Sequence, residues 1–285
     1  MNSTASSSGR TGPQVTVEAT STGRVWCARE GGQQNIATVW LSHPGKLNAL
    51  SLSMWRDIAQ CFRRFAADDQ LRAVVIRGEG SAFAAGADIS EFIDHRSTRE
   101  QARVYHDEII GGALKAILHC PVPVVAAIDG PCVGGGLEIA AVCDLRIASQ
   151  RSSFGIPIGK LGFPLAPHEA ACVVSVIGRA NALELLLEGR IWNSQEAYDK
   201  GLVHRRLADD QWEAEVAATV SRIAAGAPHA ARRNKWLIQL FSAIDDQTLL
   251  SPGQRDACWD FVETRDYARG LDAFFNKTKP DFQHD

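Results

Sequence analysis

The stretch that decides the fold runs from Pro131 to Asp144 and reads Pro-Cys-Val-Gly-Gly-Gly-Leu-Glu-Ile-Ala-Ala-Val-Cys-Asp. The apolar run at 123–128 before it, bounded by prolines and by Gly130, predicts a buried strand. The apolar residues from Leu137 to Val142 predict a buried helix. Three glycines therefore lie between a strand and a helix N-terminus, where unpaired amides favour a negative charge and missing side chains allow close approach.

Glu138 lies in the first turns of this otherwise apolar helix. A buried carboxylate is costly unless it is hydrogen-bonded or used. A second small-residue turn, Ala84-Ala-Gly-Ala-Asp88, also follows a predicted buried strand and precedes a predicted helix. Either turn alone is typical of tight packing, and Glu138 alone could be a structural carboxylate held by backbone amides. Together the two turns predict a pair of amides directed at one oxygen, as an oxyanion hole requires.

Composition narrows the function classes. The 285 residues, with 45% hydrophobic and 22% charged residues, are ordinary for a globular enzyme of one or two domains. A net charge of −3 gives no reason to expect nucleic acid as a partner. No apolar stretch approaches membrane-spanning length, so we expect no membrane partner either. Seven cysteines without a Cys-x-x-Cys pair disfavour disulfide and zinc frameworks, and we expect a cytoplasmic protein.

Other catalytic templates do not fit the sequence. The three glycines do not match Gly-x-Gly-x-x-Gly, no Gly-x-Ser-x-Gly elbow or Walker A lysine is present, and His168-Glu-Ala-Ala-Cys172 lacks the second histidine of a zinc helix. We therefore expect no metal.

The order of elements predicts an α/β core followed by a helical region. Strands are predicted at 15–19, 25–30, 36–41, 73–77, 123–128, 145–148 and 153–155, and helices at 50–68, 88–91, 100–118, 168–176, 181–187 and 194–200. From Gln211 onward the pattern is almost wholly helical. We thus expect a disordered tail at 1–13 that is no signal peptide, a core at 14–205 and a helical region at 206–285.

Four stretches together resemble the signatures of the crotonase (enoyl-CoA hydratase/isomerase) superfamily, in family order and over most of the chain. They are Lys46-Leu-Asn-Ala-Leu50, Ala82-Phe-Ala-Ala-Gly-Ala-Asp-Ile89, Gly134-Gly-Gly-Leu-Glu-Ile139 and Ala273-Phe-Phe-Asn-Lys-Thr-Lys-Pro-Asp-Phe282. The resemblance implies an α/β spiral of repeated ββα turns with a C-terminal helical trimerisation region, and a homotrimer or a dimer of trimers.

The resemblance also implies roles for individual residues. Ala87 and Gly135 fall on the positions whose amides bind a thioester oxygen, beside a catalytic Glu138. Lys46, Ala49, Ala85 and Ala87 fall on the wall for the adenine and pantetheine of coenzyme A. Phe274 and Lys277 fall where C-terminal aromatic and basic residues help to hold it. Coenzyme A is then expected as part of the acyl-CoA substrate, with no permanently bound cofactor.

The sequence departs from the family pattern at one place that matters. Typical hydratases carry a second glutamate in a Phe-Gly-x-Pro-Glu stretch, whereas this chain reads Phe154-Gly-Ile-Pro-Ile158. Ile158 cannot exchange a proton, so Glu138 is alone unless a neighbour substitutes. The candidates for that neighbour are Glu91, Asp94, His95, His106 and His168. A helix cap explains Glu91 more simply, a solvated face explains Asp94 and His95, and a helix start explains His168. Structural hydrogen bonds are the simpler reading of Asp144 and Arg146.

The predicted function is that of a lyase of the enoyl-CoA hydratase type, in fatty acid metabolism, which hydrates a 2-enoyl-CoA through a stabilised thioester enolate. Isomerisation or decarboxylation would use the same enolate, and a non-catalytic acyl-CoA binder is the alternative from another class. An acid or histidine within reach of Glu138 would favour an enzyme. If Glu138 is alone, crotonyl-CoA hydration should be slow, and Ile158→Glu should accelerate it.

Overall fold

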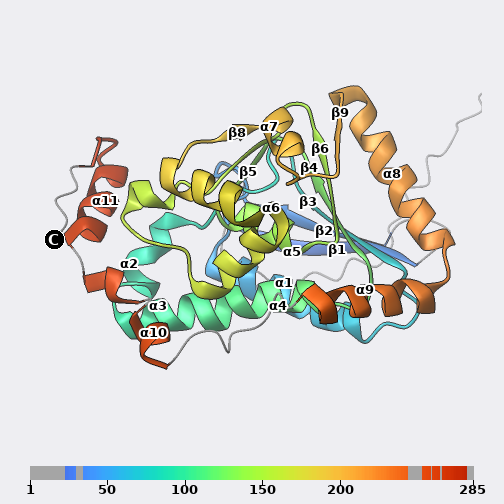
Figure 1. The fold of residues 1–285 in the computed structure, drawn as a ribbon, viewed down its shortest axis with the longest axis horizontal. Coiled ribbons are helices and arrows are strands. Elements are labelled where there is room, and N and C mark those ends of the chain that lie inside the picture. The colour runs from blue at the N-terminus through green and yellow to red at the C-terminus, as the bar shows by residue number, and fades with distance from the viewer. Residues whose placement is uncertain (1–22, 30–34, 243–251, 258, 264, 281–285) are drawn as a thin grey trace, which may run out of the picture.

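The main sheet has six strands. The computed structural model describes residues 23–29, 35–242, 252–257, 259–263 and 265–280, so the predicted tail at 1–13 and strand at 15–19 lie outside it. The strand order is β1-β2-β3-β4-β6-β9, with β1 antiparallel to β2 and all other neighbours parallel (Figure 1). The bounds are β1 Arg24–Arg29, β2 Ile36–Ser42, β3 Ala73–Gly78, β4 Val124–Ile128, β6 Leu145–Ser149 and β9 Arg205–Leu207.

Alternate residues of the central strands face two separate apolar layers. Val74 and Ile76 of β3 belong to the larger core, which contains α1 (Leu52–Ala66), α4 (Gly111–Leu118) and α5 (Gly135–Val142). Ala73 and Val75 pack instead with apolar side chains of α8 (Asp209–Ala225). The two-residue period of a strand therefore explains why the sheet is covered on both faces.

A second, three-stranded sheet connects the core to the glycine-rich turn. Its order is β5-β7-β8, formed by Pro131–Val133, Ser153–Gly155 and Trp192–Asn193. β5 follows β4 through Gly130, whose φ of +71° and close approach to the Ser81 carbonyl leave no room for a side chain. This tight turn carries the chain from the main sheet directly to the start of α5.

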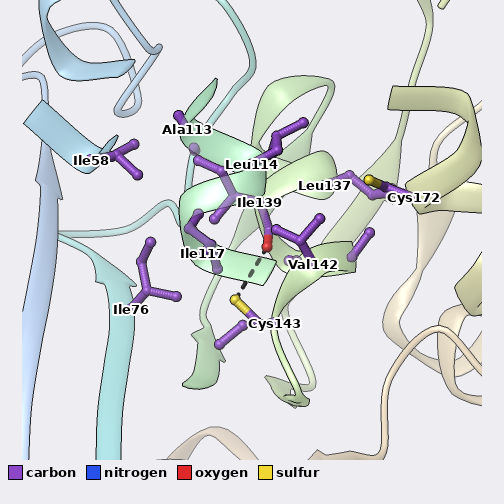
Figure 2. Close-up of a cluster of buried hydrophobic side chains, with 14 of the residues drawn as sticks. Ile58, Ile76, Ala113, Leu114, Ile117, Leu137, Ile139, Val142, Cys143 and Cys172 are labelled. Carbon is purple, nitrogen blue, oxygen red and sulfur yellow. Dashed lines mark hydrogen bonds between the residues drawn. The ribbon is translucent and has the colours of Figure 1, made fainter. Parts of the chain in front are cut away.

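Helix α5 is enclosed on every side, as its sequence predicts. All eight of its residues are buried, and Figure 2 shows Leu137, Ile139 and Val142 among side chains of α1, α4 and β3. Each fully buried large apolar side chain stabilises the fold by about 1.5–3 kcal/mol. Beyond its C-terminus, Arg146 donates from Nη1 to the Ala140 carbonyl at 3.0 Å, and Asp144 accepts from the Val124 amide at 2.7 Å. The structural interpretation of this pair is confirmed.

Three predicted helices differ in detail from the structure. The segment predicted at 100–118 is α3 (Arg99–Arg103), a π-helical stretch at Val104–Ile110, and α4. The helices predicted at 168–176 and 181–187 form one element, α6 (Pro167–Glu188), with a non-helical break at Gly178. By length and composition α6 could cross a membrane, contrary to the expectation from sequence, although core helices of soluble proteins often pass the same test.

The remaining described elements are short or C-terminal. They are α2 (Phe92–His95), α7 (Ser194–Asp199), α9 (Pro228–Ser242), α10 (Pro252–Ala257), α11 (Arg265–Phe275) and 3₁₀ turns at Ile89–Glu91, Ile158–Leu161 and Asp260–Glu263. In Figure 1, α11 lies at the same end of the molecule as α2, far from α8 and α9. The helical character predicted after Gln211 is confirmed for the described residues.

Candidate active site

The first small-residue turn is fixed by the segment that precedes α1. Asn48 has a positive φ of 57°, and its side-chain amide donates to the Ala82 carbonyl at 2.7 Å. The Leu50 amide donates to the Gly86 carbonyl at 2.7 Å, and the Asp88 amide donates to the Leu50 carbonyl at 2.9 Å. These bonds hold both neighbours of Ala87, so the position of its own amide is set by the backbone around it.

The two turns predicted to cooperate do lie together. A parallel bridge joins Ala84 to Cys132, and the Val133 amide donates to the Ala84 carbonyl at 2.9 Å. Gly86 and Gly134, with φ of +103° and +51°, approach so closely that a Cβ built on Gly134 would lie 3.4 Å from the Cα of Gly86. Their positive φ angles favour glycine at both positions.

Two amides remain available at this junction. Among the described residues, neither the Ala87 nor the Gly135 amide donates a hydrogen bond within the chain, whereas those of Ala85, Asp88 and Gly134 do. Gly135 is the first residue of α5, where an unpaired amide is expected. A Cβ on Gly135 would come within 2.7 Å of the Trp55 ring, so the missing side chain lets that ring cover the turn.

A cavity of about 110 Å³ adjoins these amides. It is lined by both turns, α5, the π-helical stretch, the start of α6 and the turn at 158–161. Its polar side chains are Arg96, Tyr105, His106, Glu138 and Glu169. A larger cavity of about 730 Å³ beside α9 contains Asp144 and Lys235 but neither turn and neither buried glutamate. We therefore place the candidate site in the smaller cavity, called the acyl pocket below.

Glu138 projects from α5 into the acyl pocket and is 5% exposed. Burial, reinforced by the negative charge of Glu169, raises the pKa of Glu138 well above its usual range, although Arg96 opposes this effect. Among the described residues its carboxyl group makes no hydrogen bond, so the interpretation as a structural carboxylate held by backbone amides is wrong. The raised pKa favours the protonated form of Glu138, which can donate a proton.

Glu169, at the third position of α6, is the second acid of the pocket and was missed by the sequence analysis. It is 2% exposed; its Oε1 lies 2.6 Å from Nδ1 of His106, and its Oε2 accepts from the Ala166 amide at 3.1 Å. Burial alone would raise its pKa. The interaction with His106 and the Ala166 amide outweighs burial, so the pKa of Glu169 is lowered. Glu169 is therefore a carboxylate that can accept a proton.

His106 fixes the orientation of this carboxylate. It lies in the π-helical stretch, where the Gly111 amide donates to the His106 carbonyl, and its ring stacks on Trp259 with centroids 5.6 Å apart. Burial lowers the pKa of His106 below its usual value, so the ring is neutral and donates its Nδ1 hydrogen to Glu169. Single π-helical turns are frequent at functional sites.

Arg96 and Tyr105 complete the polar lining, and each is 1% exposed. The Arg96 guanidinium lies over the Phe163 ring at 3.8 Å and the Phe92 ring at 4.3 Å. This cation stabilises the ionised form of both glutamates, and its influence is exceeded at Glu138 by burial. Neither residue was singled out from the sequence, because their burial depends on aromatic residues distant in the chain.

Of the five candidates for a second proton-transfer group, only His106 lines the acyl pocket. Glu91 is a helix cap, as predicted, but for α1: its Oε2 accepts from the Leu52 amide at 2.7 Å. Asp94 and His95 are exposed, which confirms that they lie on a solvated face of their helix. His168 is buried at the start of α6. Ile158 does line the pocket. The neighbour left open from sequence includes a residue outside the five candidates, because α6 places Glu169 in the same cavity.

The residues expected to hold coenzyme A are only partly brought together. Ala85 and Ala87 line the acyl pocket, whereas Lys46, Ala49, Phe274 and Lys277 do not. Lys46 pairs with Asp88 at 2.7 Å, beside the first turn. Phe274 and Lys277, at the end of α11 and just after it, are exposed. Within the part of the chain that is described, no cluster of three or more His, Cys, Asp or Glu residues could hold a metal ion.

Comparison with known proteins decides the family. The family model described as enoyl-CoA hydratase/isomerase matches residues 31–285. The chain belongs to the enoyl-CoA hydratase/isomerase family. A relative from Mycobacterium tuberculosis (strain CDC 1551 / Oshkosh), named as a probable enoyl-CoA hydratase, is 32% identical over 252 residues, which cover 88% of this chain and 95% of that protein. The resemblance stated from sequence is thereby confirmed.

Solved structures confirm an α/β fold of the crotonase type. A structure described as an enoyl-CoA hydratase/carnithine racemase from Magnetospirillum magneticum is 48% identical, with a TM-score of 0.74, and the match covers 92% of this chain and 96% of that one. A methylmalonyl-CoA decarboxylase is only 24% identical, with a TM-score of 0.80 and coverage of 94% and 100%, and shows likeness of fold alone. Fold likeness therefore does not select the reaction.

Proposed function

We propose that this member of the enoyl-CoA hydratase/isomerase family hydrates a short 2-enoyl-CoA, with Glu138 as general acid and Glu169 as general base. The observation that carries the proposal is the pair of buried carboxyl groups, from α5 and α6, in one pocket beside two available amides. Their surroundings move their pKa values in opposite directions. Such a divergence is how two carboxyl groups in one site acquire acid and base roles.

In the proposed reaction the amides of Ala87 and Gly135 bind the thioester oxygen. Polarisation of this carbonyl makes the β carbon electrophilic and stabilises the enolate formed after attack. Glu169 takes a proton from water as the water oxygen bonds to the β carbon. The electrons of the double bond move onto the thioester oxygen, and Glu138 then gives its proton to the α carbon. The product is a 3-hydroxyacyl-CoA, and Glu138 regains a proton from Glu169 or solvent.

The second acid also weighs against the alternatives. A non-catalytic acyl-CoA binder has no need to bury two carboxyl groups, one of them without a hydrogen bond among the described residues, because such burial is costly. Decarboxylation needs a stabilised enolate but little base catalysis, so an oriented Glu169 favours hydration over it. Isomerisation of a 3-enoyl-CoA would also use a base and an acid and is the second candidate.

The experiment that tests the proposal is product analysis by mass spectrometry with crotonyl-CoA, a 3-enoyl-CoA and a malonyl-type CoA. We expect hydration of crotonyl-CoA by the wild-type protein, and losses of about a hundredfold to ten-thousandfold in both Glu138→Gln and Glu169→Gln. Asp94→Asn removes an exposed carboxylate outside the pocket and serves as the control. Hydration that survives Glu169→Gln would reject the proposed base, and no turnover of any thioester by wild type would reject the enzyme.

We also propose that Lys46, Ala49, Phe274 and Lys277 contact coenzyme A and that the chain forms a trimer or a dimer of trimers. Exposed aromatic side chains support the assembly, since Trp236 is 49%, Phe274 49% and Phe275 46% exposed. They occur in two separate places, Trp236 on α9 and the adjacent pair Phe274 and Phe275 on α11, and exposed apolar groups of this kind commonly mark interfaces. Sedimentation at micromolar concentration tests this, and a stable monomer would contradict it.

A further inference from the structure

The hydroxyl group of Tyr105 has no role in the hydration proposed above. Tyr105 is 1% exposed and lines the acyl pocket. Its hydroxyl makes no hydrogen bond with any described residue. Leaving a buried hydroxyl without a partner costs free energy, so such a group in a pocket points to an acceptor on the ligand.

The Tyr105 ring is held firmly, which fixes the direction of its hydroxyl. Its edge packs against Phe92 and His106, with centroid distances of 6.0 and 5.3 Å. The residue belongs to the π-helical stretch that also carries His106. Burial raises the pKa of Tyr105, so the phenol keeps its proton and serves as a donor across the physiological range. The phenol therefore remains a hydrogen-bond donor at neutral pH.

The surroundings of Tyr105 are mixed in charge, because Arg96 lies near it together with the carboxyl groups of Glu91, Glu138 and Glu169. The Arg96 guanidinium lines the same pocket, where it faces the aromatic rings of Phe92 and Phe163. Elsewhere the pocket wall includes the apolar side chains of Ile110, Ile158 and Leu165. An oxygen atom on an otherwise apolar group would match both the donor and the walls.

We propose that the acyl pocket takes short acyl groups that carry an oxygen acceptor beyond the β carbon, and that Tyr105 donates a hydrogen bond to it. The inference rests on the proposed function, which places the acyl group here and assigns the reacting carbons to Glu138 and Glu169. The cavity volume of 110 Å³, below the ~150 Å³ that accommodates benzene, suits a short acyl group.

Binding of shape-matched thioesters tests the inference without requiring turnover. Titration calorimetry would compare 4-methylpentanoyl-CoA with 4-oxopentanoyl-CoA and with succinyl-CoA, which place a neutral and an anionic oxygen at the same distance from the thioester. We expect at least one oxygen-bearing ligand to bind the wild-type protein about twofold to tenfold more tightly than the apolar one. The better of the two then shows whether the acceptor is a carbonyl or a carboxylate.

Two tyrosine variants give the matched comparison. Tyr105→Phe should abolish the preference, so that the oxygen-bearing and apolar ligands bind with about equal affinity. Tyr198→Phe, the same change at an exposed position, should retain the preference. Equal affinities in the wild-type protein, or a preference that survives Tyr105→Phe, would overturn the inference while leaving hydration of crotonyl-CoA intact. Failure to bind any of the three thioesters would instead overturn the inference and the proposed function together.

Discussion

Glu138 and Glu169 are the same residue type in the same cavity, yet their surroundings differ in one decisive respect. Both lie near the start of a helix and are almost fully buried. Glu169 accepts hydrogen bonds from His106 and the Ala166 amide, whereas Glu138 has no hydrogen bond among the described residues. The pKa of Glu169 is lowered and that of Glu138 is raised. Hydrogen bonding, rather than depth of burial, separates acid from base.

The largest expected effect concerns a feature that serves both acids. Gly135→Pro removes the amide beside Glu138 that we propose to bind the thioester oxygen, at a helix position that accepts proline. Loss of one such donor typically lowers kcat about a hundredfold to a thousandfold. The initial rate of crotonyl-CoA hydration measures the loss, with circular dichroism as the check of folding.

The control for this variant is Gly135→Ala. Either substitution adds a Cβ that meets the Trp55 ring at 2.7 Å, but alanine keeps the amide. We expect Gly135→Ala to lose much less activity than Gly135→Pro. Equal losses would mean that displacement of Trp55, and not the amide, accounts for the effect.

A smaller effect is expected from the residue that makes Glu169 differ from Glu138. His106→Leu removes the hydrogen bond to Glu169. The pKa of Glu169 should then rise, because the interaction with His106 no longer opposes the effect of burial. Glu169 acts deprotonated, so the loss of activity toward low pH should begin at a higher pH, with roughly tenfold lower kcat at neutral pH. The loss at high pH, where Glu138 gives up its proton, should move little.

The pH profile of kcat separates this effect from a general structural one. His106→Gln keeps a side-chain donor and should restore part of the activity and part of the wild-type low-pH limb. If His106→Leu lowered kcat equally at every pH, His106 would be only a packing residue, and the contrast between the two glutamates would need another cause.

The smallest effect is expected at Ile158. Because Glu169 already supplies a carboxylate, Ile158→Glu should add a like charge to the pocket and lower hydration only severalfold, contrary to the acceleration expected from sequence. In the Glu169→Gln background the same change should recover part of the lost rate. Acceleration of the wild-type enzyme by Ile158→Glu would show that Glu138 and Glu169 are not a working pair.

The half of the site around Glu138 could be predicted from sequence because its parts are local. Glycines that need positive φ or close approach mark both turns, and the apolar helix after Gly136 is continuous in the chain. Ala87 belongs to a stretch that resembles a family signature, so it too was singled out, whereas the role of Asn48 in fixing the turn was not. Five strands of the main sheet, β1, β2, β3, β4 and β6, were predicted from their sequence patterns, whereas β9 was not.

The half around Glu169 could not be predicted, because it depends on contacts between distant segments. Pro167 and Glu169 read as an ordinary helix start, with an acid at the third position. Only the fold shows that this acid meets His106, 63 residues earlier, and faces Glu138. The π-helical stretch that carries His106 has no sequence signal distinct from an α-helix. Arg96 was missed because a lone arginine normally indicates a solvated surface.

The central claim is that, at neutral pH, Glu138 is protonated and Glu169 ionised. Infrared difference spectra between the wild-type protein and each variant, recorded without substrate, measure this directly. The signal is the carbonyl stretch of a protonated carboxyl group. We predict that such a band is present in the wild-type protein, disappears in Glu138→Gln and persists in Glu169→Gln, because burial remains the main cause of the raised pKa of Glu138. A band that disappears in Glu169→Gln and persists in Glu138→Gln would contradict the account.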